Sequence, residues 1–259
     1  MKFNFFLKWA LPVLLLLAVY PAKGKKPNLK NVVQQGGIVQ GDPGRKRIAL
    51  VFTADQWADG AETIIPALEQ RKVKGSFFFT GKFYQKFPDI IRRLVADKHY
   101  VGSHGYGHLL YFPWDRRDTM LVSHQDFNED MLKGYAAMEP FGIKKEKTRY
   151  FIPAYEHYND TVAAWAQQLG LQVVNYTNGT RSNADYTTPD MASYIGSEDL
   201  YRKVMDYERE HSLNGHFLMI HFGTHPDRTD KFYRLLPRLI YELKAKGYRF
   251  VTVKEMVEK

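Results

Sequence analysis

Short apolar runs alternate with segments of helical periodicity along most of the chain. Residues 48–52 are continuously apolar, a pattern typical of a strand buried on both faces. Residues 63–71 then repeat apolar positions at helical spacing. The same alternation continues toward the carboxyl end. Further strands are predicted at residues 75–80, 100–103, 150–152, 171–174, 217–220 and 249–253, and further helices at residues 88–97, 126–138, 161–169 and 235–246.

This order of elements predicts an α/β fold with a parallel sheet. Residues 47–259 contain no repeat of fixed period and no low-complexity linker, so we expect them to form one domain. Parallel strands bring the loops at their carboxyl ends to one edge of the sheet. The polar clusters that follow several of these strands are therefore expected to meet there.

The first 24 residues have the pattern of a secretory signal peptide. Lys2 and Lys8 precede an apolar stretch at residues 10–19, and small residues at 22–24 offer a cleavage site. The stretch is too short to span a bilayer comfortably, so we expect no stable membrane span after cleavage; an uncleaved anchor is the alternative. We therefore predict export to the periplasm or the extracellular space. Residues 25–46 are polar and are predicted to form an extended lead-in.

Composition narrows the possible partners. The chain has a formal net charge of +9 and no cysteine, which excludes disulfides and a lipid-modified cysteine. Its basic residues are scattered rather than gathered on one face, which argues against nucleic acid as a partner. Aromatic residues make up 15% of the chain, and they suit a sugar-binding cleft as well as a filled core.

Two histidines directly follow the strand predicted at residues 100–103. His104 and His108 are four residues apart, so their rings share a face if this loop turns helically. Neutral imidazoles are good ligands for Zn²⁺ and similar ions. Such a site needs a carboxylate from another strand end, and Asp55 and Asp59 both follow the strand at residues 48–52. The alternatives are surface histidines, and aspartates that form a turn or cap a helix.

Two further strand ends carry candidate catalytic groups. His221 follows the strand at residues 217–220, where it is either a catalytic acid or a buried, hydrogen-bonded residue. Tyr155 and Glu156 follow the strand at residues 150–152 and present an aromatic ring and a carboxylate.

Together these motifs resemble the polysaccharide deacetylase family, the metal-dependent carbohydrate esterases built on a distorted (β/α)₇-type barrel. The resemblance extends over residues 47–257 and rests on the order of the motifs. Residues 56–60 correspond to T-F-D-D-G, residues 104–108 to H-S/T-x-x-H, residues 152–156 to R-x-P-Y/W-G, and residues 219–221 with 247–252 to the final L-H and G-Y…F-V-T pattern. Residues 73–81 are similar to the family's V-K-A-T-F-F-V-T-G strand.

The resemblance implies a role for each matching residue. Asp59, His104 and His108 would bind a divalent metal, with Zn²⁺ favoured, and His221 would be the general acid, for which Asp185 is a candidate partner. The family's catalytic base falls on Ala58 and the Arg that orients it on Ile152. Losing both avoids an uncompensated charge in the cleft.

Two departures from the family pattern leave alternatives. A rival alignment makes Asp55 the base and leaves Gln56 as a poor metal ligand. Without the usual base, either Asp55 or Glu156 is expected to activate water. Trp57, Tyr106 and Tyr155 are candidates for contact with the sugar.

The predicted function is metal-dependent removal of N- or O-linked acetyl groups from an exported or cell-envelope polysaccharide. The alternative is an inactive barrel of the same fold that binds glycans or serves as an envelope module. The two missing family residues are the observation that favours this alternative.

Overall fold

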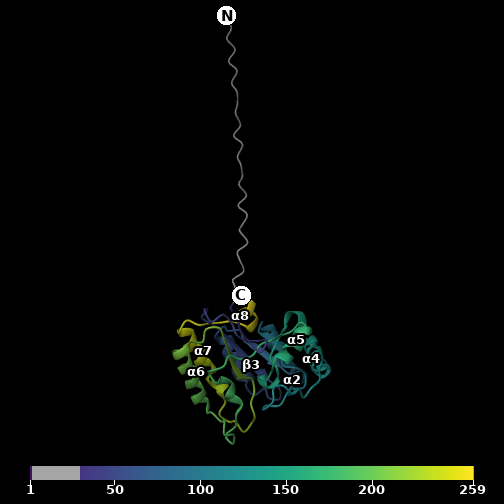
Figure 1. Cartoon of the computed structure of the whole chain (residues 1–259). Coiled ribbons are helices and arrows are strands. Elements are labelled where there is room, and N and C mark those ends of the chain that lie inside the picture. The colour runs from purple at the N-terminus through teal and green to yellow at the C-terminus, as the bar shows by residue number, and fades with distance from the viewer. Residues whose placement is uncertain (2–29, 259) are drawn as a thin grey trace.

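A computed structural model describes Met1 and residues 30–258. Seven strands of its nine-stranded sheet run parallel, and helices cover the outer face of the sheet (Figure 1). The predicted (β/α)₇-type barrel in a single domain is confirmed. The parallel strands are β3 (Arg47–Ala54), β4 (Ser76–Phe79), β5 (Tyr100–Ser103), β6 (Tyr150–Phe151), β7 (Gln172–Val173), β8 (His216–His221) and β9 (Arg249–Phe250).

A β-hairpin closes the barrel between β7 and β8. Its strands are β1 (Val32–Gln34) and β2 (Gly37–Gln40), joined at Gly36, whose φ is 74°. Strand β2 pairs antiparallel with β8, and Ile38 forms a parallel bridge with Val174, just after β7. The segment predicted as an extended lead-in therefore contributes two strands to the sheet. The predicted signal peptide at residues 1–24 falls, apart from Met1, outside the described residues.

Strand side chains alternate between two apolar cores. Along β3, Ala49 and Val51 face the barrel interior, whereas Leu50 and Phe52 face the surrounding helices. This period of two follows from the pleat of a strand, which sends successive side chains to opposite faces. All four residues are at most 1% exposed, which explains the continuous apolar run in the sequence.

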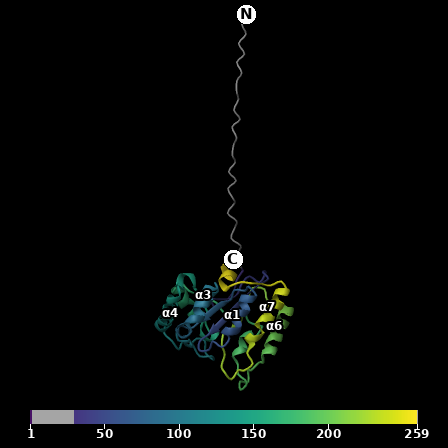
Figure 2. The same ribbon diagram turned by 180° about the vertical axis from the view of Figure 1, so that it is seen from behind.

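In the described residues, eight α-helices lie outside or at one end of the barrel. Figure 2 shows α1 flanked by α3 and α4 on one side and by α6 and α7 on the other. The α-helices are α1 (Ala61–Gln70), α2 (Gly81–Lys86), α3 (Pro88–Ala96), α4 (His124–Met138), α5 (Asp160–Gln168), α6 (Ser197–His211), α7 (Leu236–Ala245) and α8 (Val253–Glu258). Short 3₁₀ helices span Glu139–Phe141, Lys145–Lys147, Ala154–Glu156, Ser182–Tyr186 and Phe232–Leu235. Within the described part of the chain, none of the helices has the length and apolar character needed to cross a membrane.

Helix α8 replaces the last part of the strand predicted at residues 249–253. Thr252 and Glu255 form reciprocal hydrogen bonds that cap its first turn. Val253 and Met256 join the interior core, and the Val253 N–H donates to Ser76 Oγ at the start of β4. The helix thus closes the amino-terminal end of the barrel and leaves the carboxyl ends of the strands as the open rim.

We predict that acid destabilises the fold through two buried histidines. Burial lowers the pKa of His99 and of His216 to about 4, and the Gly75 N–H donates to the unprotonated His99 Nδ1. The unfolded chain binds these protons near the ordinary pKa of 6.5, so the free energy of unfolding falls as pH drops from about 6.5 toward 4. Urea denaturation should show H99N losing about 2 kcal/mol of this pH dependence. An unchanged slope in H99N would contradict this role.

Candidate active site

The register of the sheet brings several strand ends level at the open rim. Because their last residues pair across the sheet, the residues that follow also lie side by side. Thr80 Oγ1 donates to Asp55 Oδ1 over 2.9 Å, and His104 Nδ1 is hydrogen-bonded to the Ile152 carbonyl oxygen over 2.8 Å. The paired last residues are Ala54, Phe79, Ser103 and Phe151.

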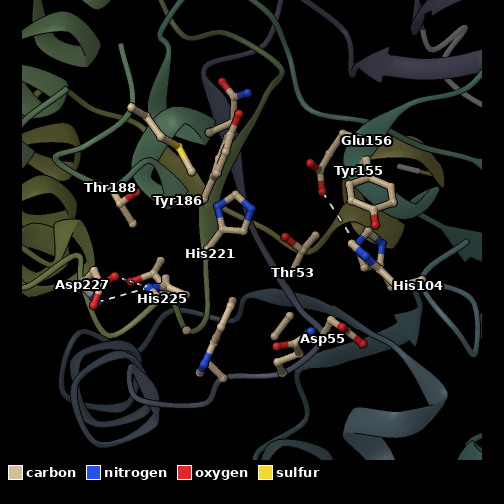
Figure 3. Close-up of a pocket in the computed structure, with 18 of the residues that line it drawn as sticks. Thr53, Asp55, His104, Tyr155, Glu156, Tyr186, Thr188, His221, His225 and Asp227 are labelled. Carbon is tan, nitrogen blue, oxygen red and sulfur yellow. Dashed lines mark hydrogen bonds and ion pairs between the residues drawn. The ribbon is translucent and has the colours of Figure 1, made fainter. Parts of the chain in front are cut away.

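A cavity of about 690 Å³ opens at this rim. Figure 3 shows His221 on one side of it, with His104, Tyr155 and Glu156 on the other. The titratable groups that line the cavity are Asp55, His104, His108, Tyr155, Glu156, Tyr176, Tyr186, Asp190, His221, His225 and Asp227. Most candidates from the sequence are therefore brought together, from loops after β3, β5, β6 and β8.

His104 and His108 are held as neutral imidazoles. Their ring centroids lie 5.0 Å apart. Since a carbonyl oxygen can only accept, His104 Nδ1 carries the proton and Nε2 retains its lone pair. Burial and the nearby His108 hold the pKa of His104 well below its usual range, and burial also lowers the pKa of His108. Both rings are in the protonation state that a metal ligand requires.

The two candidate aspartates occupy different environments. Asp55 lines the cavity, and its charge acts on His108 in the direction that raises the histidine's pKa. Asp59 instead contacts Lys231 Nζ and the Tyr233 hydroxyl at 2.8 Å each, and accepts the Thr224 N–H. It does not line the cavity. The predicted set of Asp59, His104 and His108 is therefore not brought together.

The physical reason is the position of each aspartate relative to the end of β3. Asp55 directly follows the strand and lines the cavity together with Thr53. Asp59 lies beyond the strand, where the chain has turned toward α1, and its carboxylate ties this loop to the loop after β8. Burial by itself raises the pKa of Asp59, but hydrogen bonds from Lys231, Tyr233 and Thr224 outweigh it and lower the pKa.

The side chains at the rim are of the types that bind a divalent metal ion. In the part of the chain that the structure describes, no group of three or more His, Cys, Asp or Glu side chains is already gathered around one point. His104 and His108 nonetheless offer neutral imidazoles, and His104 has the Nδ1 hydrogen bond that typically orients a metal-binding ring. Asp55 lines the same cavity, and its charge acts on His108.

Glu156 reaches the cavity through a strained backbone. Tyr155 and Glu156 have φ values of 58° and 53° in the left-handed region, which costs about 1–2 kcal/mol per residue. Asn175 Nδ2 donates to the Glu156 carbonyl oxygen over 2.7 Å and supports this turn. The Glu156 carboxylate then lies 3.8 Å from His104 Nε2. Burial raises the pKa of Glu156 to about 7, against an opposing effect of His221.

His221 pairs with a buried carboxylate. His221 Nδ1 lies 2.6 Å from Asp185 Oδ1, and the His221 N–H donates to Asp185 Oδ2. Burial by itself lowers the pKa of His221, but the charge and hydrogen bond of Asp185 raise it above its usual value. Asp185 comes from the 3₁₀ helix Ser182–Tyr186 and is 1% exposed. This arrangement orients His221 and stabilises its protonated form.

Aromatic side chains flank the cavity. The Tyr155 ring lies 4.3 Å from that of His108, and Trp57 lies edge-on to His225. Tyr106, a third candidate from the sequence, does not line the cavity; it packs over Gly81, and its hydroxyl donates to Gln85. Exposed Trp114 and Tyr186 do line the cavity. Neither was predicted, because neither closely follows an apolar strand.

Comparison with known proteins agrees with this architecture. The model of the polysaccharide deacetylase family matches residues 40–174. A peptidoglycan-N-acetylglucosamine deacetylase of Bacillus cereus is 23% identical over 231 residues, covering 88% of this chain and 97% of that protein. A second protein of the same name and organism is 26% identical over 222 residues, covering 83% of this chain and 69% of the other.

Solved structures show the same fold. The Bc1960 peptidoglycan N-acetylglucosamine deacetylase superposes with a TM-score of 0.69 at 21% identity, covering 85% of this chain and 92% of that chain. BA3943 of Bacillus anthracis, described as a CE4 family pseudoenzyme, has a TM-score of 0.67 at 20% identity, covering 86% and 69%.

The chain belongs to the polysaccharide deacetylase family, as its motifs predicted. Its class is therefore that of the carbohydrate esterases, hydrolases that remove acetyl groups from polysaccharides.

We predict that Asp55 and Asp59 differ in their effects on metal binding. Loss of an outer-shell partner typically weakens metal binding by roughly 10–100-fold, and D55N should weaken Zn²⁺ binding by more than this because it removes a ligand. D59N should retain Zn²⁺ affinity but lose about 1–3 kcal/mol of stability, because Lys231 is buried and loses its charged partner. Competition with a chelating dye and thermal unfolding measure the two effects. Loss of Zn²⁺ affinity in D59N alone would restore the assignment of Asp59 as a ligand.

Proposed function

We propose that this chain is an active, metal-dependent deacetylase of an acetylated cell-envelope polysaccharide. The observation that carries the proposal is a single cavity lined by a pair of neutral imidazoles, by the carboxylates of Asp55 and Glu156 among others, and by His221, which pairs with buried Asp185. Names of relatives support the substrate class: several are peptidoglycan-N-acetylglucosamine deacetylases, and one is a chitooligosaccharide deacetylase.

His104, His108 and Asp55 are the residues that would hold the divalent ion, for which neutral nitrogen donors favour Zn²⁺. When bound, the ion supplies Lewis-acid polarisation of the acetyl carbonyl. The proposed ligand set keeps the two histidines of the sequence prediction and exchanges Asp59 for Asp55. The exchange is supported by the position of Asp55 in the cavity and by the pairing of Asp59 with Lys231.

The remaining groups supply proton transfer. Glu156 accepts a proton from the attacking water, since its carboxylate lies beside His104 within the cavity. The water oxygen bonds to the acetyl carbon, and His221, protonated and paired with Asp185, donates a proton to the sugar nitrogen as the C–N bond breaks. The products are acetate and a free amine. Trp57 and Tyr155 line the cavity where a sugar ring would pack.

The proposed location is outside the cytoplasm. The pattern of the first 24 residues supports export, and a cell-envelope polysaccharide would be met there. Removal of Lys2, Lys8 and Lys23 with a signal peptide would leave the mature chain basic.

A second candidate is an inactive barrel that binds glycan without hydrolysing it. It is favoured by the alignment of the family's base with Ala58, and by the pairing of Asp59 with Lys231 outside the cavity. The two proposals differ in acetate release by the metal-loaded protein.

We predict that E156Q and H221A each lower kcat for acetate release by about 10²–10⁴-fold, because each removes one proton-transfer group. E156Q should still bind Zn²⁺, since Glu156 is not a proposed ligand. E69Q, at an exposed position of helix α1, is the matched control and should retain full activity.

Acetate can be measured with peptidoglycan, chitin oligomers and acetylated xylan as substrates. Full activity in both E156Q and H221A would refute the assigned roles. Glycan binding without acetate release by the Zn²⁺-loaded wild-type protein would instead establish the inactive barrel.

A further inference from the structure

A second cavity of about 240 Å³ adjoins the first at the same rim. The two share three lining residues, Tyr176, Asn183 and Tyr186, so they adjoin along these side chains. We call the smaller one the side cavity. Its other lining residues are Asn178, Gly179, Arg181, Ala184, Thr187 and Ser193.

The two cavities differ in charge. The main cavity is lined by four carboxylates, those of Asp55, Glu156, Asp190 and Asp227. The side cavity has no carboxylate among its lining residues, and its one fully charged side chain is Arg181. Asn178, Asn183 and Ser193 add uncharged polar groups to its wall. The side cavity therefore favours an anion.

Arg181 is an exposed residue of this wall, and its backbone is strained. Its φ of 60° lies in the left-handed region, which costs about 1–2 kcal/mol for a residue other than glycine. Nearby Gly179 has a φ of 115°, and a Cβ there would lie 2.2 Å from the Tyr207 ring. Within residues 30–258, no carboxylate lies within ion-pair distance of Arg181. Its guanidinium is thus available to a ligand.

We propose that the side cavity binds a carboxylate carried by the polysaccharide, on the sugar next to the one that is deacetylated. A guanidinium presents paired N–H groups that match the two oxygens of a carboxylate. The preferred substrate is then an acidic glycan, in which the carboxylate belongs either to an ether-linked lactyl group or to a uronic acid. The chain is basic even without Lys2, Lys8 and Lys23, which favours the approach of such a polymer. This inference rests on the proposed function and narrows its substrate.

The test compares glycans that differ only in charge. One pair is a peptidoglycan tetrasaccharide with free lactyl carboxylates and its methylamide form; a second pair uses a uronic acid oligosaccharide in the same two forms. Affinities are measured by calorimetric titration of the Zn²⁺-loaded protein with the N-deacetylated oligosaccharides, which cannot turn over. KM and kcat for acetate release are measured separately on the acetylated forms. The variants are R181Q and, as a matched control on helix α6, R202Q.

We expect wild-type protein and R202Q to bind at least one acid form about tenfold more tightly than its amide, as a charge-assisted hydrogen bond allows. R181Q should lose this difference and show a raised KM for that acid form, with kcat unchanged. The pair that shows the difference identifies the source of the carboxylate.

Equal binding of acid and amide forms by the wild-type protein would overturn the inference, as would a difference that persists in R181Q. Discrimination between the two forms without acetate release would support the side cavity and refute the hydrolase. Acetate release without discrimination between the two forms would support the hydrolase and refute the side cavity. The two proposals can therefore be refuted independently.

Discussion

All of the candidate chemistry depends on the hydrogen-bond register of β3 with its two parallel neighbours. Thr53 pairs with His221 on β8, and Ala54 pairs with Phe79 on β4. This register places Asp55 beside Thr80 and brings His221 to the same rim. A slip of one residue would turn each inward side chain of β3 toward the helices, so the buried, apolar faces of that strand also fix the geometry of the site.

Much of this arrangement was predictable from local pattern. Continuous apolar runs predicted the parallel strands, and the family motifs predicted the barrel. The distance from the strand end distinguishes the aspartates, because Asp55 directly follows β3 and lines the cavity, whereas Asp59 lies four residues further on. The motif alignment favoured Asp59 because it matched residue types and did not consider this distance. The partner that removes Asp59 from the cavity, Lys231, lies in a distant loop that no local pattern connects to it.

Other features depend on non-local contacts or on unusual backbone. The hairpin at Gly36 is polar, and its role appears only when β2 meets both β8 and Val174. Helix α6 is strongly polar, and its buried stripe is narrow and includes Leu200 and Val204, so no helix was predicted there. Glu156 enters the cavity through a left-handed φ that sequence alone does not assign to a glutamate.

Closure of the barrel also constrains the sequence of steps in folding. Strand β3 is early in the sequence, yet it pairs with β8 and β9, and the interior below it is filled by α8. The hairpin at residues 32–40 must likewise wait for β8 before the ring is complete. Contacts of such large sequence separation slow folding, because loop-closure entropy is lost before they form. The barrel can therefore assemble fully only after almost the whole chain has been synthesised, which keeps the polypeptide unfolded for longer than a local fold would.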